Sequence, residues 1–167
     1  MLAVVAFPVL AEADGRKIDA LRIQHDPNAK RIAPHFTLVF PTDRLDETAL
    51  RKRVDDCTGA MAPIAVALKR ILVHQEGAES YLYLVPEQGY DALIALHARL
   101  NPGDDGKVAF TPHVTVARMA DRKQARAVAT SLATKHFSVN GRVEALSIVE
   151  VPPSGAVRTI HTASLRG

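Results

Sequence analysis

The stretch APHFTLVFPTDR (Ala33–Arg44) places a histidine and a threonine two residues apart in an otherwise apolar run. A second stretch, TPHVTVARMADR (111–122), has the same pattern. The offset of 78 that maps His35 onto His113 also maps a proline, a threonine, an aspartate and an arginine onto their counterparts. The sequence therefore indicates an internal repeat.

The two halves of this repeat, about 1–78 and 79–156, have the same predicted order of elements. A β-rich run opens each half, followed by a helix, the histidine strand, a second helix and closing strands. The expected opening strands are 2–7 and 81–85, the first helices 14–24 and 90–100, and the closing strands 64–74, 137–151 (with a weak interior at Asn140–Gly141) and 157–165. Asp43 and Asp121 are predicted to N-cap the second helices.

Two such units related by a pseudo-twofold axis predict an α+β fold. We expect one domain, 1–167, built from two lobes. Each lobe is expected to hold an antiparallel-rich sheet with outer helices, and a central cleft separates the lobes. The loops expected from composition are HQEGAES (74–80) and NPGDDGK (101–107).

Strand alternation places His35 and Thr37 on one face of the first motif strand, with Phe40 on the opposite, packing face. His113 and Thr115 share a face in the second. A single copy is best explained as a half-exposed strand with two polar residues facing water. Two copies in the same context favour a function, because helix capping and strand entry explain the repeated aspartate and proline but not the histidine and threonine.

The chemistry of these residue types suggests that function. Two facing imidazoles can serve as general base and general acid, because histidine titrates near neutral pH. Two threonine hydroxyls between them can hold the non-bridging oxygens of a phosphate. The set suits in-line displacement at phosphorus, and neither a cofactor nor a metal is expected.

The paired motifs PHFTL and PHVTV resemble the 2H phosphoesterase superfamily, and in particular its bacterial 2′-5′ RNA ligase-like branch, the RNA 2′,3′-cyclic phosphodiesterases. The resemblance covers essentially the whole chain and implies a bilobal α+β fold. It implies that His35 and His113 are catalytic and that Thr37 and Thr115 bind phosphate. The first motif lacks the Leu-Gly that usually follows this strand.

The function that this resemblance implies is hydrolysis of a 2′,3′-cyclic phosphate on an RNA terminus or a small nucleotide. Two alternatives stay open at this point. One is 2′-5′ RNA ligation, the reverse chemistry at the same site. The other is a non-catalytic protein that binds RNA or a nucleotide. Intact histidine and threonine pairs in both copies favour an enzyme.

Four further residues are candidates for the site. Arg118 ends the second motif strand and is predicted to reach the phosphate. Phe7, Tyr83 and Phe110 are candidates for substrate binding, since aromatic rings stack on bases, although an ordinary structural role is favoured for each: core packing for Phe7 and Tyr83, and a surface or core position for Phe110. His97 falls on the apolar face of its helix and is expected to be a packed core residue.

Composition limits the remaining classes of function. The chain has 167 residues, a net charge of +3 and a pI of about 9.2, which suits an anionic ligand. Its single cysteine, Cys57, is expected to be buried and inert, as in a reducing compartment. The apolar N-terminus aligns with the internal strand 81–85, which argues against a signal peptide. We expect a cytoplasmic monomer that does not associate with membranes.

Overall fold

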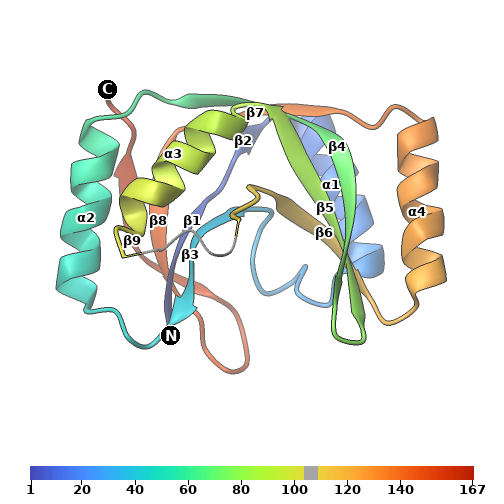
Figure 1. Cartoon of the computed structure of the whole chain (residues 1–167), viewed down its shortest axis with the longest axis horizontal. Coiled ribbons are helices and arrows are strands. Elements are labelled where there is room, and N and C mark those ends of the chain that lie inside the picture. Colours follow the sequence, from blue (N-terminus) through green and yellow to red (C-terminus); the bar gives the residue numbers. More distant parts are fainter. Residues whose placement is uncertain (104–108) are drawn as a thin grey trace.

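The computed structural model describes residues 1–103 and 109–167, which form one curled nine-stranded sheet with four helices (Figure 1). The strands are β1 (Leu2–Ala6), β2 (Val9–Leu10), β3 (Phe36–Thr42), β4 (Ile64–Glu76), β5 (Glu79–Gln88), β6 (Val114–Met119), β7 (Val139–Val143), β8 (Ala145–Glu150) and β9 (Arg158–Ser164). The helices are α1 (Glu12–His25), α2 (Glu47–Gly59), α3 (Tyr90–Leu100) and α4 (Arg122–Thr134).

The α+β prediction is confirmed, but the prediction of two separate sheets is wrong. The strands form one antiparallel sheet in the order β2-β7-β4-β5-β6-β3-β1-β8-β9. The two motif strands, β3 and β6, are neighbours in it and are joined by the pair Phe36 and Val114. The sheet is continuous because the repeated strands pair edge to edge instead of facing each other across a cleft.

Elements of the two sequence halves are exchanged within this sheet. β4 pairs with β5 and β7, whereas β8 pairs with β1 and β9. Helix α1 packs on β6 and α3 packs on β3. In Figure 1, α2 and α3 cover one end of the sheet, and α1 and α4 cover the other. Each half therefore buries apolar surface that belongs to the other half.

A β-bulge interrupts each motif strand at the same position of the repeat. Between β1 and β3, Thr37 pairs with Val5 and Val39 with Val4, so that Leu38 is skipped. Between β5 and β6 the same shift skips Val116. A bulge reverses the alternation of side chains beyond it.

The alternation predicted for Phe40 is therefore wrong. Phe40 is 55% exposed, whereas Val39, which simple alternation places on the face of His35, is buried. The carbonyl oxygen of Leu38, the residue that the bulge skips, accepts hydrogen bonds from two side chains at the end of α3. His97 Nδ1 donates to this oxygen at 2.8 Å and Asn101 Nδ2 donates at 2.9 Å. The predicted core position of His97 is confirmed, and its hydrogen bond fastens α3 to β3.

Helix capping follows the prediction at one site and departs from it at the other. Asp121 caps α4, where its carboxylate accepts from the backbone N–H groups of Lys123 and Gln124. Asp43 is not the cap of α2. Asp46 takes that role, and its carboxylate accepts from the Ala49 N–H at 2.8 Å. β3 runs to Thr42 and a turn follows, so the helix begins later than the repeat alone suggests.

Other boundaries differ in detail from the prediction. The predicted strand 137–151 is divided at Glu144 into β7 and β8, whereas Asn140 and Gly141 stay paired within β7. A side chain at Gly141 would clash with β2, because an added Cβ would lie 2.7 Å from the Val9 carbonyl oxygen. The predicted loop 74–80 is a hairpin that turns at Gly77, with a φ of 57°. Residues 104–107 of the other predicted loop lie outside the described residues.

The core lies between the sheet and its helices. Phe36, Leu38, Leu84, Val114 and Ile148 are among its fully buried side chains. Each large apolar side chain buried in this way contributes roughly 1.5–3 kcal/mol. The predicted burial of Cys57 is confirmed, and this burial raises the pKa of its thiol. Within residues 1–103 and 109–167, no helix combines the length and hydropathy needed to cross a membrane.

Candidate active site

The centre of the sheet brings the four motif side chains together. Phe36 and Val114 are paired and fully buried, so the residues that flank them point to the opposite face. The antiparallel register places His35 across from Thr115 and, on the other side of the pair, His113 across from the first threonine. The two histidines thus occupy opposite corners of a four-residue group with a threonine at each remaining corner.

Both imidazoles are held by the same backbone contact. The Nδ1 atom of His35 lies 2.8 Å from the Ala33 carbonyl oxygen, and that of His113 lies 2.7 Å from the Thr111 carbonyl oxygen. A carbonyl oxygen only accepts, so each Nδ1 carries the proton. Each Nε2 is then left to take up or give a proton. A proline lies between the carbonyl and the histidine in both copies, and its fixed φ shapes this turn.

The surroundings of the histidines favour their neutral forms. Burial lowers the pKa of His35, and the nearby Arg22 and His113 lower it further, against the opposing effects of the Ala33 hydrogen bond and the Asp26 carboxylate. Burial also lowers the pKa of His113, with a smaller effect in the same direction from His74. Because the two imidazoles influence each other, a proton on one disfavours a proton on the other. The state in which both imidazoles are protonated is therefore disfavoured.

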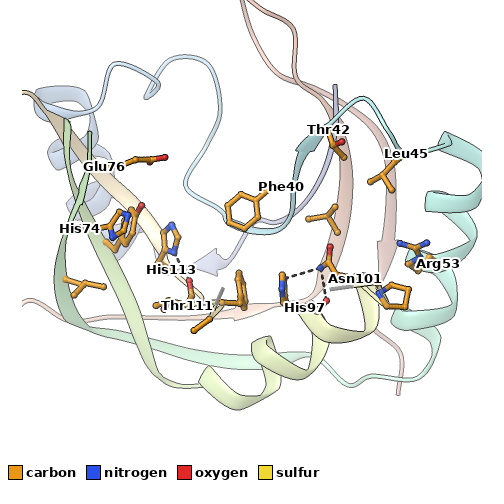
Figure 2. Close-up of a pocket in the computed structure, with 17 residues that line it drawn as sticks. Phe40, Thr42, Leu45, Arg53, His74, Glu76, His97, Asn101, Thr111 and His113 are labelled. Atoms are coloured by element: carbon orange, nitrogen blue, oxygen red, sulfur yellow. Dashed lines mark hydrogen bonds between the residues drawn. The ribbon is translucent and has the colours of Figure 1, made fainter. Parts of the chain in front are cut away.

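Two cavities flank the group. A cavity of about 220 Å³ is lined by His35, Thr37 and Thr115. A larger cavity of about 810 Å³ is lined by His113 (Figure 2). The two histidines and two threonines are therefore brought together, but each histidine lines a different cavity.

The small cavity contains charged residues that the sequence did not single out. Arg22 and Asp26, both almost completely buried, form an ion pair with an Nε to Oδ2 distance of 3.0 Å. Arg31 also lines the cavity and donates to the carbonyl oxygens of Pro152 and Gly155 at 3.0 and 2.8 Å. Arg22 could have been found from its spacing, because it follows the buried Ile18 by four residues and so lies on the same face of α1.

The large cavity is mostly aromatic and apolar. Tyr83 stacks on His113 with ring centroids 3.7 Å apart and an interplanar angle of 19°. His74 of β4 also stacks on this tyrosine, with ring centroids 5.3 Å apart. Burial raises the pKa of Tyr83 to about 12, so its hydroxyl stays protonated. Phe40, another residue that the sequence did not indicate, projects into this cavity in Figure 2.

The remaining candidates lie at different distances from the group. Phe110 lines the large cavity and stacks on His97 with centroids 3.8 Å apart. Phe7 meets His35 edge-on at 6.1 Å and packs against a small apolar cluster of β1 and β8. Arg118 lines neither cavity. Its guanidinium group lies 3.5 Å from the Glu79 carboxylate and 5.8 Å from the centre of the Tyr81 ring. Among the described residues, no group of three or more His, Cys, Asp and Glu side chains is placed to hold a metal ion.

Comparisons with solved structures show the same fold. Over 99% of its length, the chain matches 98% of TT0787 of Thermus thermophilus, with a TM-score of 0.68 and 20% identity. It matches E. coli LigT, complexed with 3′-AMP, with the same coverage, a TM-score of 0.65 and 18% identity. Kluyveromyces marxianus Usb1 matches with a TM-score of 0.56 and 14% identity over 95% of this chain and 97% of its own. No curated protein sequence matches.

The amino-acid sequence itself identifies the family of this chain. The model of the 2′-5′ RNA ligase superfamily matches residues 8–152, which include both His-x-Thr motifs and most of the sheet. The resemblance inferred from the paired motifs is thereby confirmed. The chain belongs to the 2′-5′ RNA ligase superfamily of 2H phosphoesterases.

Proposed function

We propose that this protein hydrolyses a 2′,3′-cyclic phosphodiester on an RNA terminus or a nucleotide. The observation that carries the proposal is the diagonal pair His35 and His113, each with Nδ1 bound to a backbone carbonyl and Nε2 left for proton transfer. The threonines that complete the group, Thr37 and Thr115, line the small cavity with His35 and offer hydroxyl donors there.

The proposed reaction uses one histidine as base and the other as acid. The base takes a proton from water as the water oxygen attacks phosphorus, and the acid protonates the ribose oxygen that leaves. The two threonine hydroxyls donate to the non-bridging oxygens, whose negative charge grows in the transition state. Because each Nδ1 keeps its proton throughout, both transfers occur at Nε2.

Relatives with known ligands support a nucleotide substrate. E. coli LigT was solved in complexes with 3′-AMP and with phosphate. Complexes of the same protein with ATP and NADP+ are also known. At 16–18% identity these relatives share the fold, and the substrate of this chain is inferred from its own site.

A direct assay tests the proposal. Purified protein is incubated with the four nucleoside 2′,3′-cyclic phosphates in the presence of EDTA, and the phosphomonoester product is measured. We expect turnover by the unaltered protein and a loss of at least about 100-fold in His35→Ala and His113→Ala, in line with the usual contribution of a general acid or base. His161→Ala is the matched control, because His161 pairs with Asp55 outside the site.

The same assay separates the alternatives. Adding an RNA with a 5′-hydroxyl end to one with a 2′,3′-cyclic end detects 2′-5′ ligation. A non-catalytic binding protein would show no turnover in the unaltered protein, in His35→Ala or in His113→Ala, and it would still bind the nucleotide after either substitution. That result would refute the proposed hydrolase.

A further inference from the structure

Arg22 of α1 is a buried cation with more hydrogen-bond donors than its protein partners use. Only 3% of its surface is exposed. Its Nε donates to Asp26 Oδ2 at 3.0 Å, and its Nη2 donates to the Asn28 carbonyl oxygen at a long 3.5 Å. Within the part of the chain that the structure describes, Nη1 has no acceptor, and every side-chain nitrogen or oxygen that is sealed from solvent has a hydrogen-bond partner. The Nη1 atom therefore faces open space.

Arg22 shares such a space with the motif group. It lines the cavity of about 220 Å³ together with His35, Thr37 and Thr115. Burial lowers the pKa of His35 and the charge of Arg22 lowers it further, so the guanidinium group lies within electrostatic reach of the imidazole. Arg22 also borders a wider cavity of about 630 Å³, but none of the four motif side chains lines that one.

The small cavity suits a compact anion. Its volume lies below the 300–1,000 Å³ that is usual for drug-sized ligands, and it has room for a phosphoryl group. Asp26 is the one acidic side chain among its described lining residues, and both carboxylate oxygens already accept hydrogen bonds, from Arg22 and from the Asn28 N–H at 2.9 Å. Two arginines and two threonine hydroxyls also line the walls, so the cavity carries an excess of positive charge and of donors.

Phosphoryl transfer requires such donors at the non-bridging oxygens, where negative charge grows in the transition state. The arginine that the sequence predicted for this role, Arg118, lines neither cavity of the site and lies 3.5 Å from the Glu79 carboxylate. Arg31 does line the small cavity, but all three of its guanidinium nitrogens already donate to protein oxygens. Arg22 is the lining arginine that has a nitrogen to spare.

We propose that Arg22 binds the phosphoryl group of the substrate, with Nη1 donating to a non-bridging oxygen beside the threonine hydroxyls. Asp26 and the Asn28 carbonyl hold the other edge of the guanidinium group. Arginine stays protonated in proteins, so this contact adds charge stabilisation and no proton transfer to the reaction. The inference rests on the proposed function and adds a phosphate ligand to its site.

The first test measures the binding of inorganic phosphate by calorimetry at fixed ionic strength. The double variant Arg22→Gln, Asp26→Asn removes both charges of the pair and leaves the net charge of the protein unchanged. We expect the Kd for phosphate to rise about 10- to 100-fold, in line with the loss of a hydrogen bond to a charged group. An unchanged Kd, or no phosphate binding by the unaltered protein, would overturn the inference.

The matched control for this test is Arg158→Gln, Glu150→Gln. It neutralises an ion pair in the same way, but Arg158 is exposed and neither residue lines a cavity of the site. Its Kd for phosphate should stay close to that of the unaltered protein, because the net charge is the same and water screens the exposed pair. An equal rise of the Kd in both double variants would overturn the inference.

The second test uses Arg22→Lys, which also decides the question should the neutral double variant not fold. Lysine keeps the charge and can pair with Asp26, but its single nitrogen cannot hold that carboxylate and reach the phosphoryl group at once. We expect kcat/KM for a nucleoside 2′,3′-cyclic phosphate to fall about 100-fold, the usual loss of one oxyanion donor, with little change in the melting temperature. Lysine would satisfy a merely structural ion pair, so full turnover by Arg22→Lys would overturn the inference.

The two readouts separate this inference from the proposed function. Phosphate binding that depends on Arg22, with no turnover of any cyclic substrate by the unaltered protein, would refute the hydrolase and support Arg22 as a phosphate ligand. Equal turnover by the unaltered protein and by Arg22→Lys would support the hydrolase and overturn the role of Arg22.

Discussion

Phe36 and Val114 pair across the boundary between β3 and β6, and both side chains are fully buried beneath the four motif residues. This pair joins the two repeats into one sheet and sets the register that places each histidine across from a threonine. The packing of the core and the geometry of the candidate site therefore depend on the same two positions.

Replacing Phe36 tests this dependence. We expect Phe36→Ala to lower the free energy of unfolding by about 3–5 kcal/mol, because it leaves a cavity in a closely packed core. Phe40→Ala is a matched control in the same strand, since Phe40 is 55% exposed, and its cost should stay below about 1 kcal/mol. Urea denaturation of both variants measures the difference. Similar losses for the two would contradict the structure.

The threonine hydroxyls are expected to act in the transition state and not in folding. Thr37→Val and Thr115→Val keep the shape of each side chain and remove the donor. We expect each to lower kcat by about 100- to 1,000-fold, the usual loss of one oxyanion donor, with an unchanged melting temperature. Thr→Ser at the same positions restores the hydroxyl and should recover most of the rate. A Ser variant as slow as its Val counterpart would show that the hydroxyl is not the group that matters.

Stability should fall on the acid side of neutrality because of the two motif histidines. Burial lowers the pKa of both His35 and His113 in the folded protein, while the unfolded chain keeps the ordinary value near 6.5. Below 6.5 the unfolded state binds more protons, so the free energy of unfolding decreases as pH falls, until the lowered folded pKa values are reached. Urea denaturation between pH 7.5 and pH 5 measures this slope. The double variant His35→Gln, His113→Gln should flatten it, and an unchanged slope would contradict the assignment.

The sequence predicts which motif side chains share a face because the signals for this are local. A His-x-Thr pattern on a strand fixes which side chains share a face, and the offset of the repeat identifies the second copy. The exchange of β4 and β8 between the halves has no such local signal, since it depends on which strand edges meet. The exposure of Phe40 depends on the bulge at Leu38, and the burial of Arg22 depends on where α1 packs. These features became visible only once the tertiary contacts were known.

The helix caps test whether α2 begins where the structure places it or where the repeat predicts it. Asp121→Ala and Asp46→Ala should each lower the free energy of unfolding by about 1 kcal/mol, because each removes the acceptor for backbone N–H groups in a first helical turn. Asp43→Ala should be nearly neutral. Thermal unfolding of the three variants compares them under one condition. A larger loss of stability for Asp43→Ala than for Asp46→Ala would contradict the structure and support the start of α2 that the repeat predicts.

The buried pair of Arg22 and Asp26 offers a double-mutant test beside the site. Arg22→Met leaves a buried carboxylate without its partner and should lower the free energy of unfolding by about 3–5 kcal/mol. Asp26→Leu in the same chain removes that unpaired charge, so the double variant should regain much of the loss. Chemical denaturation of the two single variants and the double variant gives the coupling energy. The exposed pair of Lys52 and Asp56 on α2 is the matched control, for which the coupling should be much smaller because water screens the two charges. Additive losses at Arg22 and Asp26 would show that their contact contributes nothing beyond two independent side chains.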